Sequence, residues 1–87
     1  MPSTLDQIRN ALLGLANNFD GYSFSVDQII TKMNGDIFTV ESLIRGSYTR
    51  VDQHIISDLG SAQEQVKQAR EMLNTAASRA RDYAAQL

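Results

Sequence analysis

The 87-residue sequence contains no cysteine and no tryptophan, and it has one proline and one histidine. The absence of cysteine excludes disulfide bonds and thiolate metal ligands. The single histidine, His54, has no nearby pair of acids with which to form a metal site, so we expect it to be a surface or packing residue. No glycine-rich phosphate loop follows a strand, and no serine has a base within sequence reach. The sequence therefore predicts no catalytic residue, no cofactor and no metal, and a protein that is not an enzyme.

The sequence also lacks the features of a conventional signal peptide and of a membrane span. The N-terminus has no basic region, and Asp6, Arg9 and Asn10 interrupt any apolar stretch there. No run approaches the roughly 20 apolar residues that a membrane-spanning helix needs. We therefore expect a chain that is cytoplasmic before any export, does not insert into membranes, and would be secreted without a conventional leader.

Charge is sparse and unevenly divided. The net charge is -2, with two basic and five acidic residues in positions 1–44 and six basic and five acidic residues in positions 45–87. Neither half forms a basic patch, so nucleic-acid binding has little electrostatic support. The acidity of the first half also argues against an amphipathic membrane binder. The difference between the halves favours their pairing with each other.

Apolar residues recur every three or four positions through both halves, which is typical of amphipathic α-helices. Each predicted stripe contains one doubled step of four, at Met33 and at Ile55, which predicts a local relaxation of a supercoil. The first stripe is Leu5, Ile8, Leu12, Leu15, Phe19, Tyr22, Val26, Ile29, Met33, Ile37, Val40 and Ile44; the second is Tyr48, Val51, Ile55, Leu59, Ala62, Val66, Ala69, Leu73, Ala76, Ala80, Tyr83 and Leu87.

A short turn separates the two stripes at Arg45-Gly46-Ser47. Gly46 can adopt the left-handed conformation that ends a helix, and Ser47 is a good cap for the next one. The sequence therefore predicts an all-α fold with a single domain over residues 1–87. This domain is an antiparallel two-helix hairpin with arms of about 3–44 and 48–86 and a turn at 45–47. We expect two such hairpins to complete a four-helix bundle by dimerisation.

The first arm has an alternative interpretation. Asn17–Gly21 and Asn34–Asp36 are turn-like strings, and each glycine in them costs about 1 kcal/mol against alanine inside a helix. A first arm broken at Gly21 or Gly35 would give a compact bundle of shorter helices. The stripe keeps its register across both glycines, which favours one continuous arm.

Several large apolar residues lie beside the stripes. A two-helix hairpin has no third layer to cover them, so they are candidates for a partner interface. They could instead widen the contact between the two arms. The predicted interface comprises Leu13, Phe24, Ile30, Phe38, Leu43, Ile56 and Met72.

The length, the two equal helical arms and the glycine in the central turn resemble the WxG-type family of small type VII secretion proteins. The matching turn motif is Ile44-Arg45-Gly46, in which isoleucine stands where the family has tryptophan. The resemblance implies a helical hairpin that pairs as a homodimer or heterodimer and acts as a type VII secretion substrate. It equally suits the targeting or chaperone partner of a larger toxin, such as the N-terminal region of an LXG-type toxin.

The family's export signal is a tyrosine followed four residues later by an acid, just after the second helix. The candidate export-signal region here is Tyr83 to Leu87, where leucine replaces the acid. The sequence thus departs from the family at the residue on which independent export depends. This departure favours a chain that travels with another secreted protein.

Two other functions remain open. A self-assembling needle or filament subunit is also a short helical hairpin, although such subunits typically carry prolines in the turn and none lies near Gly46. An intracellular adaptor or immunity-type protein would bind one enzyme and stay inside the cell. Fibres in electron micrographs and assays of culture supernatant would separate these functions from secretion.

Overall fold

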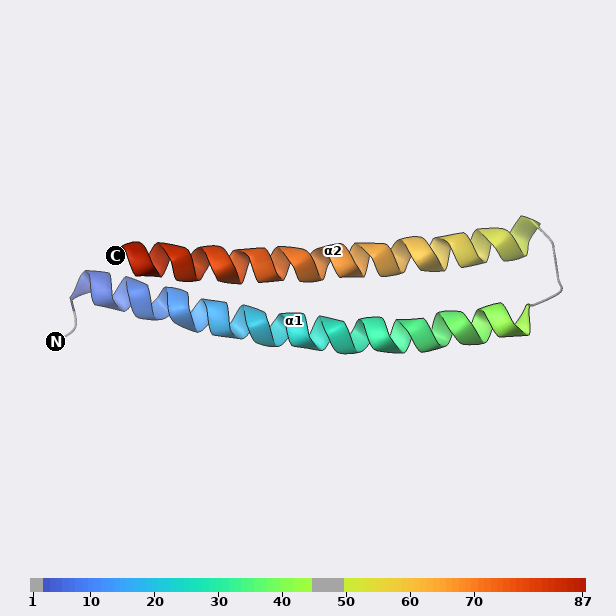
Figure 1. Ribbon diagram of the computed structural model, residues 1–87, viewed down its shortest axis with the longest axis horizontal. Coiled ribbons are helices and arrows are strands. Elements are labelled where there is room, and N and C mark those ends of the chain that lie inside the picture. The colour runs from blue at the N-terminus through green and yellow to red at the C-terminus, as the bar shows by residue number, and fades with distance from the viewer. Residues whose placement is uncertain (1–2, 45–49) are drawn as a thin grey trace.

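The structure, a computed structural model, describes residues 3–44 and 50–87. These residues form two α-helices, α1 (Thr4–Leu43) and α2 (Arg50–Gln86). The helices run antiparallel, with the start of α1 and the end of α2 at the same end of a rod that measures 68 × 17 × 12 Å (Figure 1). The predicted all-α helical hairpin is confirmed.

The first arm is one continuous helix of 40 residues, which passes through Gly14, Gly21 and Gly35 without a break. A Cβ atom added at each of these glycines would meet no neighbouring atom within 4 Å. The turn-like strings therefore do not interrupt α1, and the alternative of a broken first arm is wrong.

Both ends of α1 have defined caps. The Ser3 hydroxyl accepts a hydrogen bond from the backbone N–H of Asp6 at 3.1 Å, and the Asp6 carboxylate pairs with Arg9 at 2.7 Å. At the other end the backbone N–H of Ile44 donates to the Val40 carbonyl at 3.1 Å. The predicted turn residues Arg45, Gly46 and Ser47 lie outside the described residues.

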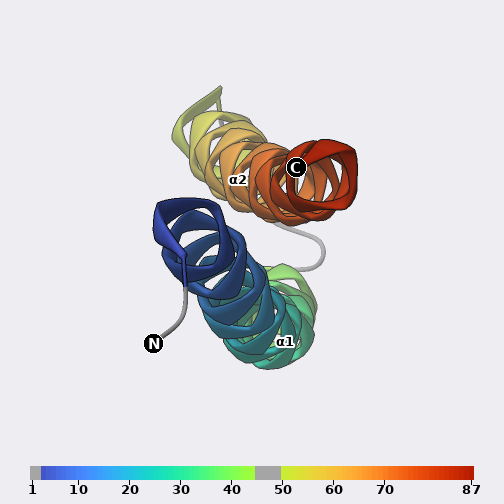
Figure 2. The ribbon, with the colours of Figure 1, turned by 90° about the vertical axis from the view of Figure 1, so that its left-hand side faces the viewer.

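The helices meet along one row of side chains on each arm, which we call the seam. Its members are buried or half-buried, and they occupy positions a and d of a seven-residue repeat. Viewed along the rod, the helices are inclined to one another (Figure 2). The seam comprises Leu12, Ala16, Phe19, Ser23, Val26, Ile30, Met33, Ile37, Val40 and Ile44 of α1 and Ile56, Leu59, Gln63, Val66, Arg70, Leu73, Ala77, Ala80, Ala84 and Leu87 of α2.

The seam corrects part of each predicted stripe. Leu15, Tyr22 and Ile29 are 40%, 54% and 48% exposed, and the residue after each of them faces α2 instead. The same shift of one residue occurs on α2. The seam steps alternate between three and four throughout, so the doubled steps predicted at Met33 and Ile55 do not occur. The residues that replace the predicted ones are Ala16, Ser23, Ile30, Ile56, Gln63, Arg70, Ala77 and Ala84.

Small side chains explain the shift. Ala16, Ala77 and Ala80 form a buried cluster, against which Leu12 and Phe19 pack. The distance between two helices depends on the side chains at their contact, so alanine allows a closer approach than leucine or tyrosine. In the view of Figure 1 the helices lie closest near the chain ends, where these alanines are, and draw apart toward the other end. Among the described residues no large side chain is fully buried, so the interior is thin.

Candidate protein-interaction surface

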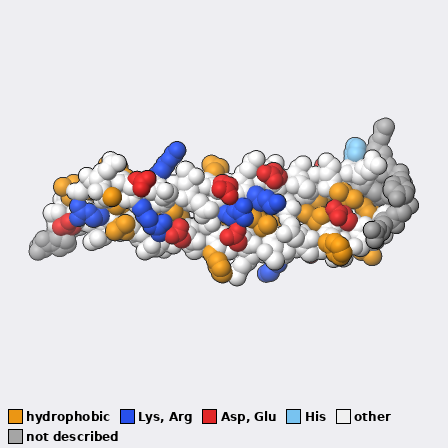
Figure 3. All heavy atoms as spheres, viewed as in Figure 1, with side chains coloured by type: hydrophobic (Ala, Val, Ile, Leu, Met, Phe, Trp, Pro, Cys, Tyr) orange, Lys and Arg blue, Asp and Glu red, His pale blue; other side chains and the backbone are white. Residues whose placement is uncertain are grey.

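One flank of the seam carries polar side chains that join the two helices, and we call it the ionic flank. Arg81 donates hydrogen bonds to the Asp20 carboxylate and, at 3.1 Å, to the Asn17 amide oxygen. Acidic and basic side chains gather in neighbouring clusters along the face drawn in Figure 3. The ionic flank comprises Asn17, Asp20, Asp27 and Asn34 of α1 and Gln63, Arg70 and Arg81 of α2.

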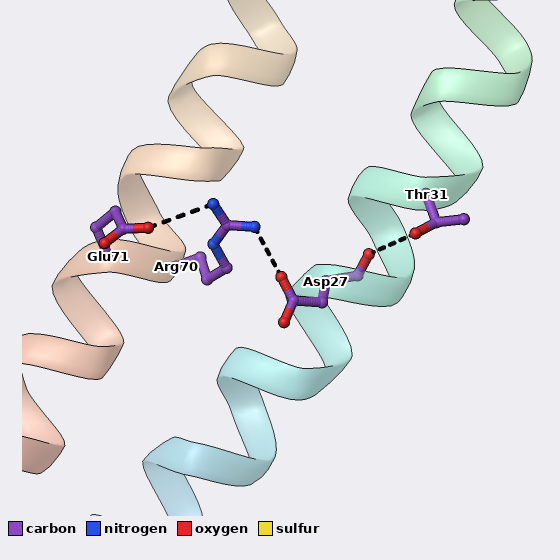
Figure 4. A network of polar contacts seen from close by, with 4 residues as sticks. All are labelled: Asp27, Thr31, Arg70 and Glu71. Atoms are coloured by element: carbon purple, nitrogen blue, oxygen red, sulfur yellow. Dashed lines mark hydrogen bonds and ion pairs between the residues drawn. The ribbon is translucent and has the colours of Figure 1, made fainter.

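Arg70 occupies a seam position, but its guanidinium reaches out to the ionic flank (Figure 4). It donates to the Asp27 carboxylate at 2.8 Å and to the Glu71 carboxylate at 3.3 Å, while the Thr31 hydroxyl donates to the Asp27 carbonyl at 3.1 Å. The hydrogen bond to Asp27 is the largest influence on Arg70, and its pKa rises above an already high ordinary value. The pairing with Asp27 therefore favours the charged form of Arg70.

The ionic flank fixes the alignment of the helices more than it stabilises them. The side chains of Arg70, Asp27, Arg81 and Asp20 are between 28% and 52% exposed. Ion pairs with this exposure contribute little to stability, because water and salt screen the attraction between the charges. Their geometry is informative, however, because Asp20 and Arg81 both occupy position e of the repeat. In this antiparallel pair, position e of one helix therefore meets position e of the other, and position g must meet position g on the opposite side.

That opposite side, which we call the apolar flank, carries a row of apolar side chains at position g of both helices. Its larger members are between 40% and 80% exposed. The row recurs every seven residues, and Asp36 is its one charged position. A row of exposed apolar side chains on one side of a molecule is a candidate interaction site. The apolar flank comprises Ile8, Leu15, Tyr22, Ile29 and Leu43 of α1 and Ile55, Ala62, Ala69, Ala76 and Tyr83 of α2.

The structure places two of the predicted interface residues inside the hairpin. Ile30 is 7% exposed and Ile56 is half-buried, and both belong to the seam. The expectation that they lie beside the contact between the arms is therefore wrong. Ile30 is the residue that takes the place expected for Ile29.

The other five predicted interface residues are exposed but do not share one side of the rod. Leu13, Phe24 and Phe38, at 39%, 64% and 70% exposure, occupy positions e and b on the side of α1 that carries the ionic flank. Leu43, at 80%, belongs to the apolar flank, and Met72, at 73%, borders it at position c of α2. Most residues of the apolar flank were expected in the stripes that pack one arm on the other, and not among the predicted interface residues.

The two residues of the candidate export-signal region lie on different faces. Tyr83 is 55% exposed and belongs to the apolar flank. Leu87 is half-buried at the last seam position, and its backbone N–H donates to the Ala84 carbonyl at 3.3 Å. The tyrosine side chain is therefore accessible to a partner in the hairpin as it stands.

Little else in the described part of the chain suggests a chemical site. His54 is exposed on α2. Across residues 3–44 and 50–87 no three histidine, aspartate or glutamate side chains lie close enough together to hold a metal ion. Neither α1 nor α2 contains an apolar stretch that could cross a membrane.

Comparison with known proteins adds no further assignment, because no protein family, curated protein or solved structure matches this chain.

Proposed function

We propose that this chain is a non-enzymatic helical interaction module whose apolar flank packs against the helices of another hairpin. One observation carries the proposal. Apolar side chains occupy position g of both helices along nearly the whole rod, and the larger ones are 40% to 80% exposed. The opposite flank carries the interhelical ion pairs Arg70–Asp27 and Arg81–Asp20, so the regular apolar row lies on one side of the seam.

The thin interior supports a partner on energetic grounds. A chain of this size buries a smaller fraction of its surface than a larger domain does, and such chains are commonly stabilised by oligomerisation or other staples. The described residues contain no fully buried large side chain. A second hairpin laid on the apolar flank would turn the g positions into interior positions of a four-helix bundle.

The proposed role is that of a type VII secretion substrate, or of the targeting or chaperone partner of a larger secreted toxin. The hairpin, with helices of 40 and 37 residues, has the architecture that the resemblance to the WxG-type family implies. The protein would act in the cytoplasm before export.

A matched pair of variants tests the interaction surface. Ile29→Asp places a charge on the apolar flank, and Phe38→Asp places the same charge at a more exposed position, 70% against 48%, on the other side of α1. In cells that produce the tagged chain, crosslinking should capture a helical secretion protein or toxin with the wild type and with Phe38→Asp. Ile29→Asp should lose that partner. Equal capture by both variants would contradict the proposal.

The secretion role has a separate test. The chain should appear in culture supernatant, alone or together with a toxin, only when the type VII ATPase is intact. A chain that stays inside the cell with an enzyme bound to it would support an immunity-type role instead, and fibres of the purified chain would support a filament subunit.

A further inference from the structure

The part of the apolar flank that belongs to α2 is nearly symmetric about Ala69. Ala62 and Ala76 lie seven residues to either side of it, and Ile55 and Tyr83 lie fourteen residues to either side. Three small residues are thus bracketed by two large ones. Two copies of this row, placed antiparallel around Ala69, would set small side chains against small ones and large against large.

The charges beside this row follow the same symmetry with opposite sign. Asp58 lies eleven residues before Ala69 and Arg79 lies ten residues after it. Both occupy position c, which borders position g on the side away from the ionic flank, and both are exposed. A two-fold axis near Ala69 would therefore bring Asp58 of each copy level with Arg79 of the other.

We propose that a second copy of this chain covers the apolar flank, with α2 packed antiparallel on α2 about a two-fold axis near Ala69 and with two reciprocal Asp58–Arg79 pairs. This inference rests on the proposed function, because it names the occupant of the same flank. A two-fold contact must be self-complementary, and this row is so in both side-chain size and charge.

The one charge on the apolar flank, Asp36, does not meet its own counterpart in this arrangement. Arg70, the neighbour of Ala69, pairs with Asp27, so the axis crosses α1 near Asp27. Asp36 lies nine residues further along α1. At a rise of about 1.5 Å per residue, the Asp36 carboxylates of the two copies lie roughly 25 Å apart, well beyond the Debye length of about 8–10 Å.

Charge reversal provides the test. Sedimentation equilibrium of the purified full chain should show a dimer of twice 9.7 kDa. Asp58→Arg and Arg79→Asp should each weaken this dimer about tenfold or more, because each creates two like-charge contacts. An equimolar mixture of the two single variants should form a heterodimer close to wild-type affinity, because both contacts then regain opposite charges. The double variant should also recover.

The matched control is Glu64→Arg, an exposed acid of α2 at position b, on the side of the ionic flank. It should leave the dimer unchanged, and circular dichroism should show full helicity for every variant. A wild-type chain that is monomeric at about 100 µM would overturn the second copy as occupant, while capture of another hairpin through Ile29 would leave the proposed function standing. If the mixture of Asp58→Arg and Arg79→Asp forms a heterodimer no tighter than the homodimer of either variant, the two-fold arrangement is wrong.

Discussion

The ionic flank and the apolar flank border the same seam on opposite sides, but they carry different kinds of side chain. Polar side chains join the two helices on the first, and exposed apolar side chains line the second. On the ionic flank, Arg70 and Arg81 reach across from α2 to acids of α1. On the apolar flank, residues such as Tyr22 and Ile29 stand about half exposed and no charge lies among them until Asp36. Polar contacts join the helices on one flank, whereas the apolar side chains of the other flank stay exposed and form the surface proposed for a partner. Association and alignment are thus separable, and substitutions on the two flanks should have different effects.

The largest expected effect comes from charge placed in the seam between the flanks. Leu73 is half-buried at position d, and Leu73→Asp would bring an unpaired carboxylate into the apolar contact. We expect the free energy of unfolding to fall by about 2–4 kcal/mol, measured by urea denaturation. The adjacent Met72→Asp, at a side chain 73% exposed beside the apolar flank, should weaken association and change unfolding by less than about 0.5 kcal/mol. Equal destabilisation by both would invalidate the assignment of the faces.

A smaller gain is expected on the face of α1 that belongs to neither flank. A methyl group at Gly21 meets nothing within 4 Å. Gly21→Ala should therefore stabilise the helix by about 0.5–1 kcal/mol, seen as a higher melting temperature. Association should not change. A loss of stability would contradict the open space that the structure shows around Gly21 in the continuous helix α1.

The ionic flank should contribute less. Removing the pair between Asp20 and Arg81 with Arg81→Gln should lower the free energy of unfolding by less than Gly21→Ala raises it, and the loss should shrink in 1 M salt, where exposed charges are screened. The proposed dimer should persist, because the proposal assigns its contact to the apolar flank. A double-mutant cycle with Asp20→Asn isolates the pair, and a coupling energy near zero would show that Arg81 acts only through packing.

The smallest effect is a pH response at the start of α1. The hydrogen bonds from the Ser3 hydroxyl and backbone hold the pKa of Asp6 below its ordinary value. A carboxyl group with a lowered pKa stabilises the fold above its unfolded pKa, and this contribution is lost as the pH falls through the lowered value. Below about pH 4 the first turn should fray, so that the protection factors of the amides near Asp6, which correct exchange rates for their intrinsic pH dependence, fall there. Asp6→Asn should remove this pH dependence, and an unchanged profile would rule out the cap as its source.

Much of the fold could be predicted from the sequence because helix, strand and turn differ in local pattern. The period of apolar residues and the turn-forming string at Arg45-Gly46-Ser47 predicted two long helices, and position d of the seam, from Leu12 to Leu87, was placed correctly. The acidic first half and the more basic second half predicted that the arms attract, and the Asp27–Arg70 pair joins them. Each of these features depends on the local pattern within one helix or on the composition of one half, so it can be read from the sequence without knowing how the helices pack.

Most of the seam residues at position a could not be predicted from local pattern. Leu15 and Ala16 both satisfy steps of three and four, and the larger residue is the stronger apolar signal. Which of them faces α2 depends on how close the helices come, a property of the pair. Arg70 was missed in the seam because hydrophobicity excludes it. Two signals could have identified it: acids one heptad apart at Asp20 and Asp27, and an uninterrupted seven-residue repeat without doubled steps.

The most direct test of the account is whether the apolar flank, at Ala69, touches itself in a second copy. The chain has no cysteine, so one introduced thiol reports on one position. Under mild oxidation the variant Ala69→Cys should form a disulfide-linked dimer within minutes, and Asn74→Cys, at position e of α2 beside the ionic flank, should remain a monomer on gels. Dimers from Asn74→Cys as fast as from Ala69→Cys, or none from Ala69→Cys, would contradict the account.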